Sequence, residues 1–147
     1  MAATTSISTD MDDAQQILVP ISAGELIDKI TILEIKQQKL QRPDALMNVK
    51  KELELLQQAL NNAVKSFPAS IYIKLLRAKQ NLEIVNQKLW NVEDTLREYE
   101  QEKNFEIEFV DLARSVYMLN DERASIKRSI NILCGSSLIE EKSYGGV

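Results

Sequence analysis

The chain contains no histidine and only one cysteine among its 147 residues. Histidine is the commonest general base and the commonest zinc ligand, so its absence excludes Ser-His and Cys-His catalytic pairs and histidine metal sites. The single cysteine, Cys134, has no partner for an internal disulfide bond. Because it stands at the end of a helical pattern, we expect a small packed apolar residue rather than a nucleophile. The sequence therefore predicts no catalytic residue, no metal site and no cofactor.

Glycine, proline and aromatic residues are also scarce. Four glycines and three prolines are too few for the many turns of an all-β protein, and the aromatic content is only 5%. The abundant Leu, Ile, Lys, Glu and Gln favour helix. No apolar run approaches the ~20 residues of a membrane span, and no basic region precedes an apolar run at the N-terminus, so no signal peptide is expected. The net charge of −4 gives no general attraction to nucleic acid. We therefore expect a cytoplasmic all-α protein.

The N-terminal part of the chain divides into a leader and a strap. Residues 1–16 are small, polar and acidic without periodicity, so we expect a disordered leader followed by a single helical domain over residues 17–147. The domain opens with "ILVPIS", in which Pro20 forbids helix and favours an extended strap lying on the fold. Ser22 and Glu25 then form a Ser-x-x-Glu capping box, which is a specific signal for a helix start.

Four helices are predicted, at about 23–41, 44–66, 70–102 and 105–134, followed by a tail over residues 135–147. In each helix, apolar residues recur at alternating steps of three and four, as in antiparallel, coiled-coil-like packing. Pro43 and Pro68 end the first two helices, and Gly135 ends the last. Short connections make sequential helices antiparallel. The predicted fold is an all-α, up-down-up-down four-helix bundle in which the last two helices form a long coiled-coil-like hairpin.

The last two helices are longer than the first two, so the outer part of their hairpin should project beyond the bundle. A two-helix arm leaves its apolar seam incompletely covered, and such patches usually mark interfaces. Symmetric dimers are the commonest closed assemblies. We therefore expect a homodimer through this arm, or a protein partner bound to it, with five residues at the contact: Val92, Leu96, Tyr99, Phe105 and Phe109.

The apolar seam of the last helix contains one charged residue, Arg123. The antiparallel register places Glu34 of the first helix level with about residue 122 and Asp28 level with about residue 128, so we expect Arg123 and Lys127 to meet Glu34 and Asp28. Three more polar residues lie on the same side of the last helix: Tyr117, Asn120 and Asn131. A buried charged layer adds little net stability, so its expected role is to fix the register of the helices. The alternative is a ligand site at the same residues.

A second polar feature is expected where the first helix begins. The backbone N–H groups of Ser22 and Gly24 would attract an anion, because a helix N-terminus carries partial positive charge. Arg128 and Lys127 are expected near this end of the bundle, and the tail "GSSLIEEKSY" reaches it. We expect one of the tail glutamates to fill the anion site as an internal latch. The alternative is a bound phosphate or carboxylate ligand.

Three strings of the sequence, "VPISAGELIDKITILEIK", "LARSVYMLNDERASIKRSIN" and "GSSLIEEKSY", carry a resemblance. Together they resemble a small family of bacterial and phage proteins catalogued as a domain of unknown function. The resemblance covers Val19 to Tyr144. It implies a setting near surface-polysaccharide and glycosyltransferase genes or in phage–host processes, and it supplies no catalytic residues.

Two functions fit these observations. The first is a non-catalytic, cytoplasmic helical accessory protein that self-associates. The second is a small enzyme or sensor that binds an anionic metabolite, such as a phosphorylated sugar, a nucleotide or a dicarboxylate. In the second, basic side chains would hold the anion and a carboxylate would exchange protons; the residues are Lys29, Arg123, Lys127 and Arg128, with Asp28 or Glu34.

Overall fold

The computed structural model describes residues 16–142 of the chain. Its helices are α2 (Ala23–Lys39), α3 (Pro43–Val64), α4 (Ala69–Glu102) and α5 (Ile107–Leu133). No strand occurs among residues 16–142, so the expected all-α class is confirmed. None of the four helices combines the length and the hydrophobicity needed to cross a bilayer. Residues 1–15 of the expected leader and the last five residues of the tail lie outside the described residues.

Local signals set the ends of the helices. The Ser22 hydroxyl caps α2 by accepting a hydrogen bond from the Glu25 N–H at 3.1 Å. Pro43 is the first residue of α3, where a backbone N–H would lack a helical partner in any case. α5 stops at a Schellman motif in which Gly135 has a φ of 65° and the following N–H donates to the Asn131 carbonyl at 2.8 Å.

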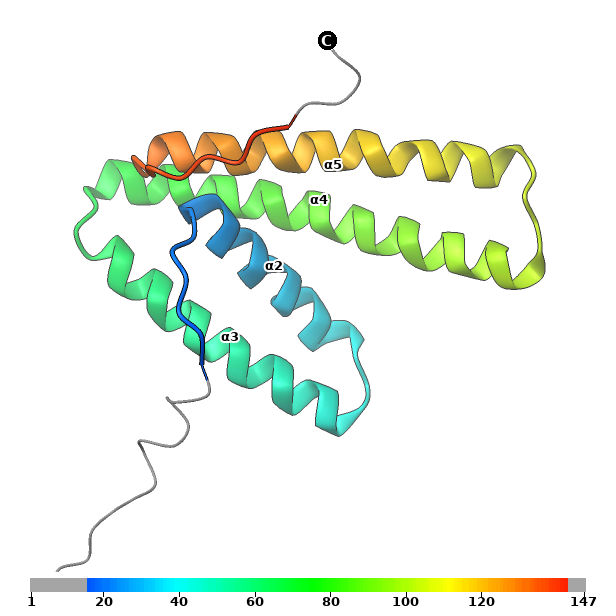
Figure 1. Ribbon diagram of the computed structural model, residues 1–147, viewed down its shortest axis with the longest axis horizontal. Coiled ribbons are helices and arrows are strands. Elements are labelled where there is room, and N and C mark those ends of the chain that lie inside the picture. Colours follow the sequence, from blue (N-terminus) through cyan, green and yellow to red (C-terminus); the bar gives the residue numbers. More distant parts are fainter. Residues whose placement is uncertain (1–15, 143–147) are drawn as a thin grey trace, which may run out of the picture.

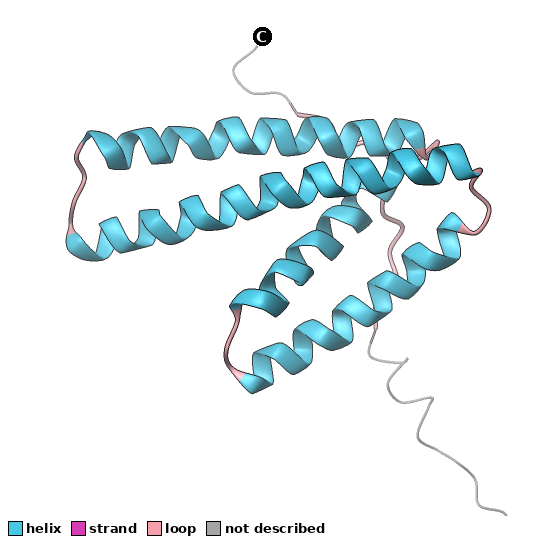
Figure 2. Ribbon diagram, turned by 180° about the vertical axis from the view of Figure 1, so that it is seen from behind, coloured by secondary structure: helices cyan, strands magenta, loops and turns pink. Residues whose placement is uncertain are grey.

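The helices form two antiparallel hairpins that cross obliquely. The α2–α3 hairpin diverges from the α4–α5 hairpin (Figure 1), and the view from behind shows the same V-shaped arrangement (Figure 2). α2 contacts all three other helices, whereas α3 packs mainly against α2. The long α4–α5 hairpin is present. The regular four-helix bundle expected from the sequence is not confirmed, because α3 lies outside the layer that α2 forms with α4 and α5.

α2 is the central helix of the fold. Its buried residues lie on more than one side of the helix: Gly24, Ile27, Asp28, Ile30, Thr31, Leu33 and Ile35. The apolar core joins Ile27 to Leu75 and Leu82 of α4 and to Ile130 of α5. Cys134 packs against this cluster, and burial raises the pKa of its thiol, as expected for a packed residue rather than a nucleophile.

The strap before α2 is extended but leaves its apolar side chains in solvent. Ile17, Leu18 and Val19 are 88%, 89% and 66% exposed. The extended backbone expected from Pro20 is present, whereas the expected packing of the strap on the fold is wrong.

The outer half of the α4–α5 hairpin extends past the α2–α3 hairpin (Figure 1). We call residues 89–122 the arm. None of the arm's side chains is buried. All the buried residues of α4 and α5 lie in the rest of the hairpin, residues 69–88 and 123–133, which we call the hairpin base. The projecting arm expected from the helix lengths is therefore present, and it is held together by its own two helices.

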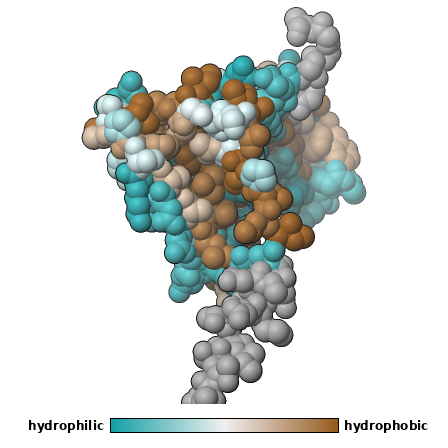
Figure 3. Space-filling model, turned by 60° about the vertical axis from the view of Figure 1, so that its left-hand side comes forward, coloured by the Kyte–Doolittle hydropathy of each residue, from teal (hydrophilic) through white to brown (hydrophobic). Residues whose placement is uncertain are grey.

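Hydrophobic side chains are also exposed on the hairpin base. The view toward this end of the molecule shows hydrophobic residues gathered between hydrophilic borders (Figure 3). Tyr72, Ile73 and Leu76 at the start of α4 are 42%, 51% and 43% exposed, and Ile132 at the end of α5 is 65% exposed. The hairpin thus offers apolar surface at both ends.

Candidate functional site

Arg123 of α5 is held by Asp28 of α2. The Arg123 Nε donates to Asp28 Oδ1 at 2.8 Å and an Nη atom donates to the second carboxylate oxygen, so the pair is bidentate. The Asp28 side chain is 1% exposed and the Arg123 side chain 28% exposed. The hydrogen bond with Asp28 raises the pKa of Arg123. The charge in the seam of α5 is therefore matched by a buried carboxylate of α2.

Two neutral side chains complete this polar layer. Asn86 of α4 donates through Nδ2 to Asp28 Oδ1 at 3.0 Å and to Thr31 Oγ1 at 2.8 Å. Thr31 in turn donates to the Asp28 carbonyl oxygen at 2.8 Å. The layer therefore joins three helices. The sequence prediction missed Asn86 and Thr31, because neither interrupts an apolar seam and no spacing signal marks them.

Lys127 of α5 forms a second buried charge. Its side chain is 8% exposed, and its Nζ lies 2.8 Å from a carboxylate oxygen of Glu25 and 2.7 Å from one of Glu140. Burial by itself lowers the pKa of Lys127, but the hydrogen bonds with Glu140 and Glu25 outweigh burial and raise the pKa. Lys127 therefore stays charged and ties the start of α2 to both α5 and the tail.

The start of α2 lies directly against the backbone of α5. The Gly24 N–H donates to Asn131 Oδ1 at 2.6 Å, and a Cβ on Gly24 would lie 2.4 Å from the Lys127 carbonyl oxygen. The Ser22 hydroxyl accepts the Glu25 N–H. The N–H groups of Gly24 and Glu25 are thus occupied by neutral oxygens of the chain, and the tail glutamates contact Lys127 and Arg128 instead.

The tail instead contacts side chains and backbone along α5. Besides the contact of Glu140 with Lys127, Glu141 accepts a hydrogen bond from Arg128 Nη1 at 3.1 Å. Lys142 Nζ lies 3.6 Å from Asp121 Oδ1 and donates to the Asn120 carbonyl at 3.3 Å. An internal latch therefore exists, but it consists of ion pairs and not of a helix cap.

Two predicted site residues lie apart from the α5 cluster. Glu34 pairs with Lys79 of α4 at 3.0 Å, so its expected contact with α5 is wrong. The reason is the oblique crossing of the hairpins, which turns this part of α2 toward α4. Lys29 is exposed to solvent on α2 and makes none of the contacts described above.

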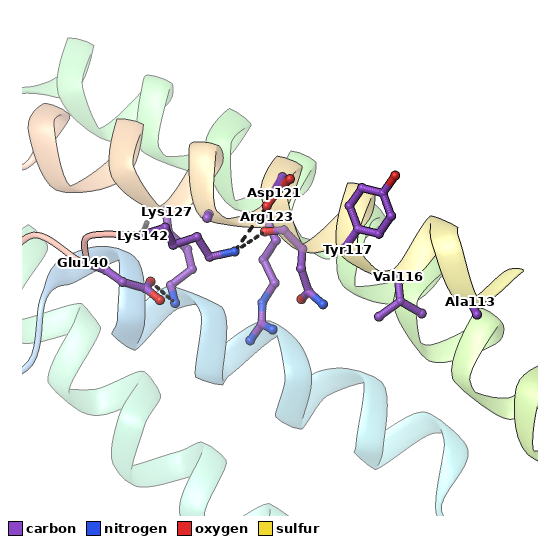
Figure 4. Close-up of a pocket in the computed structure, with 10 residues that line it drawn as sticks. Ala113, Val116, Tyr117, Asp121, Arg123, Lys127, Glu140 and Lys142 are labelled. Atoms are coloured by element: carbon purple, nitrogen blue, oxygen red, sulfur yellow. Dashed lines mark hydrogen bonds and ion pairs between the residues drawn. The ribbon is translucent and has the colours of Figure 1, made fainter. Parts of the chain in front are cut away.

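A groove of about 680 Å³ runs along α5 beside these residues (Figure 4). Apolar and small side chains line one part of it: Ala113, Val116, Tyr117 and Ala124. Polar and charged side chains line the rest: Asn120, Asp121, Arg123, Lys127, Glu140 and Lys142. A smaller cavity of about 260 Å³ reaches Arg123 from the α4 side. Each of the three cations in the groove already has a carboxylate partner in the chain.

Residues 17–147 match the model of a family whose description is "Family of unknown function (DUF6165)". The chain belongs to this family. The resemblance to a domain of unknown function is thereby confirmed. No curated protein and no solved structure matches the chain. Membership of DUF6165 carries no activity with it, so the function is inferred from the geometry of the site.

The polar layer is a closed network. Among the described residues, every buried side-chain nitrogen and oxygen has a hydrogen-bond partner, and no group of three or more His, Cys, Asp or Glu side chains could hold a metal ion. Asp28 accepts hydrogen bonds from both Arg123 and Asn86. Such an arrangement is typical of a layer that fixes helix register.

Proposed function

We propose that this protein is a non-catalytic, cytoplasmic helical interaction protein that self-associates through its arm. The main support is the arm's lack of a core, since residues 89–122 contain no buried side chain although they make up about half of the α4–α5 hairpin. Burial of apolar surface has to offset the entropy lost when two long helices are ordered. A second copy packed on the arm would supply the missing burial.

The outer side of α5 carries the apolar side chains that a second copy would cover. Ile107, Val110, Tyr117 and Met118 are 70%, 44%, 54% and 51% exposed. Positions 107, 110 and 117 are separated by three and seven residues, so they share one face of a helix. We call these four residues the α5 stripe. An exposed apolar stripe on a helix is a common feature of interfaces.

The contact residues expected from the sequence are positioned to hold the arm itself together. Phe105 and Phe109 pack edge to face with ring centroids 5.2 Å apart, and the Tyr99 hydroxyl donates to Glu108 at 3.0 Å. Val92, like Leu96, Tyr99 and Phe109, is partly buried. We therefore assign the self-association surface to the α5 stripe. The expected contact residues instead stabilise the packing of α4 against α5 within the arm.

Two matched substitutions test this proposal. Val110 in the α5 stripe and Leu55 in α3 are both 44% exposed. In sedimentation equilibrium at micromolar concentration, the wild-type protein should have twice the chain mass of 16.7 kDa. Val110→Glu should be monomeric, because it places a charge in a buried apolar contact. Leu55→Glu should remain dimeric, because α3 lies outside both the arm and the hairpin base. A monomeric wild-type protein, or equal effects of the two substitutions, would contradict the proposal.

The groove beside Arg123 supports a second candidate, the binding of an anionic metabolite such as a phosphorylated sugar, a nucleotide or a dicarboxylate. A ligand would have to replace Glu140 on Lys127. Glu140→Gln should therefore increase the response to the ligand. A ligand at 100 times its Kd raises the free energy of unfolding by about 2.7 kcal/mol, which a thermal-shift assay detects. No shift with any of the three classes, in either the wild type or Glu140→Gln, would exclude this candidate.

A further inference from the structure

Charge is unevenly distributed along the molecule. The arm, residues 89–122, contains ten acidic and three basic side chains, which gives a net charge of −7. The rest of the described chain, residues 16–88 and 123–142, contains nine acidic and fifteen basic side chains, which gives +6. The described part of the protein is therefore close to neutral as a whole but strongly polarised, with the arm as its negative end.

The basic charge on the α4–α5 hairpin lies at its base. In α4, residues 69–82 include Lys74, Arg77 and Lys79 and no acidic residue. Lys79 pairs with Glu34 of α2. Lys74 and Arg77 are exposed and form none of the ion pairs described above. The hairpin base thus presents positive charge to a partner.

We infer that a second copy of this chain binds antiparallel, with the acidic arm of each copy against the basic hairpin base of the other. The inference rests on the proposed self-association. A parallel dimer would bring together two arms of net charge −7, which like-charge repulsion opposes. In the antiparallel dimer both arm contacts are attractive, and two-fold symmetry makes them identical.

The acidic arm and the basic hairpin base are far enough apart for the relative orientation of the two copies to affect the electrostatic energy. α5 has 27 residues, so it is about 40 Å long at 1.5 Å per residue. Surface charges interact over a distance of about 8 Å at physiological salt. Repulsion between two arm tips would therefore not be cancelled by the basic residues at the far end of the hairpin.

Exposed apolar side chains also lie at both ends of the α4–α5 hairpin. Phe105 and Ile107 at the arm tip are 49% and 70% exposed. The hairpin base exposes Ile73 and Ile132, 51% and 65%, at the other end. Antiparallel pairing about the middle of α5, near residue 120, places the apolar tip of one copy beside the apolar base of the other. Apolar burial and charge pairing then favour the same arrangement.

Two charge-reversed variants test the orientation. The arm variant, Glu102→Lys/Asp111→Lys, and the base variant, Lys74→Glu/Arg77→Glu, change only exposed side chains. Each variant alone should dimerise at least about tenfold more weakly than wild type, because its homodimer places like charges together. In an equimolar mixture of the two, every arm again faces a base of opposite charge. The mixture should therefore form heterodimers with an affinity within about threefold of the wild-type value.

Sedimentation equilibrium of the wild type, each variant and the mixture gives the dissociation constants. Recovery in the mixture also requires both variants to be folded, which circular dichroism melting checks independently. If the arm variant dimerises more tightly than wild type, or if the mixture stays as weak as its components, the antiparallel arrangement is overturned while self-association stands. If the wild type is monomeric at every concentration, the proposed function fails instead.

Discussion

Replacing Arg123 with alanine is the most severe test of the polar layer. The Asp28 carboxylate, which is 1% exposed, would keep the Asn86 amide as a donor but lose its charged partner. Removal of one partner of a buried ion pair costs about 3–5 kcal/mol. We expect a value of about 3 kcal/mol, because Arg123 is 28% exposed and water can partly replace it. Small domains have unfolding free energies of about 5–15 kcal/mol, so the loss would be large.

Urea unfolding followed by far-UV circular dichroism measures this loss. The chain offers a matched control in Arg42, which pairs with Asp44 at 2.6 Å through side chains that are 79% and 67% exposed. Arg42→Ala should leave the unfolding midpoint unchanged, since exposed ion pairs contribute little. Equal effects of the two substitutions would show that burial of the Asp28 pair has no energetic consequence.

A double substitution separates charge burial from packing. Arg123→Leu with Asp28→Met removes both charges and leaves Asn86 hydrogen-bonded to Thr31. Apolar replacement of a buried ion pair is often neutral or stabilising, so this variant should recover most of the stability lost in Arg123→Ala. A cost below about 1 kcal/mol for Arg123→Ala would refute the reasoning, because that is the value of a solvated surface pair.

Two further substitutions test the backbone geometry. Gly24→Ala should lower the free energy of unfolding by about 1–3 kcal/mol, because the new Cβ would lie 2.4 Å from the Lys127 carbonyl oxygen. This loss should exceed the gain from the helix preference of alanine. An increased melting temperature would contradict the close approach of Gly24 to α5. Lys103→Gly should raise the free energy of unfolding by about 1 kcal/mol, because Lys103 has a φ of 56° at the end of α4. Lys103→Ala is the control, and a gain in both variants would show that the left-handed backbone is not the cause.

The limits of the helices were predictable from the sequence because single residues set them. Pro43, Pro68 and Gly135 act through their own backbone geometry, and the Ser22 cap acts within one turn. The crossing of the two hairpins was not predictable in this way. It depends on contacts between distant segments, such as the approach of Gly24 to the backbone of α5.

The contacts of the site were likewise predictable only where they depend on local spacing. A charge in an apolar seam requires an opposite charge nearby, so a carboxylate of the first helix was expected beside Arg123. The predicted register placed Glu34 there and Asp28 beside Lys127, whereas the structure pairs Arg123 with Asp28. The register used for that prediction assumed side-by-side helices, and it therefore placed Glu34 against α5 although Glu34 contacts Lys79. Asn86 is a neutral side chain beside a seam, which in a sequence looks the same as a solvated helix surface.

Hydrogen exchange of the unmodified protein at two concentrations tests the central claim of self-association through the arm most directly. Backbone amides of residues 89–122 should exchange more slowly at high concentration, because the second copy covers the arm, whereas amides in the first turns of α3, outside both the arm and the hairpin base, should not change. Arm amides that exchange at the same rate at nanomolar and at high micromolar concentration, while the core stays protected, would contradict the claim.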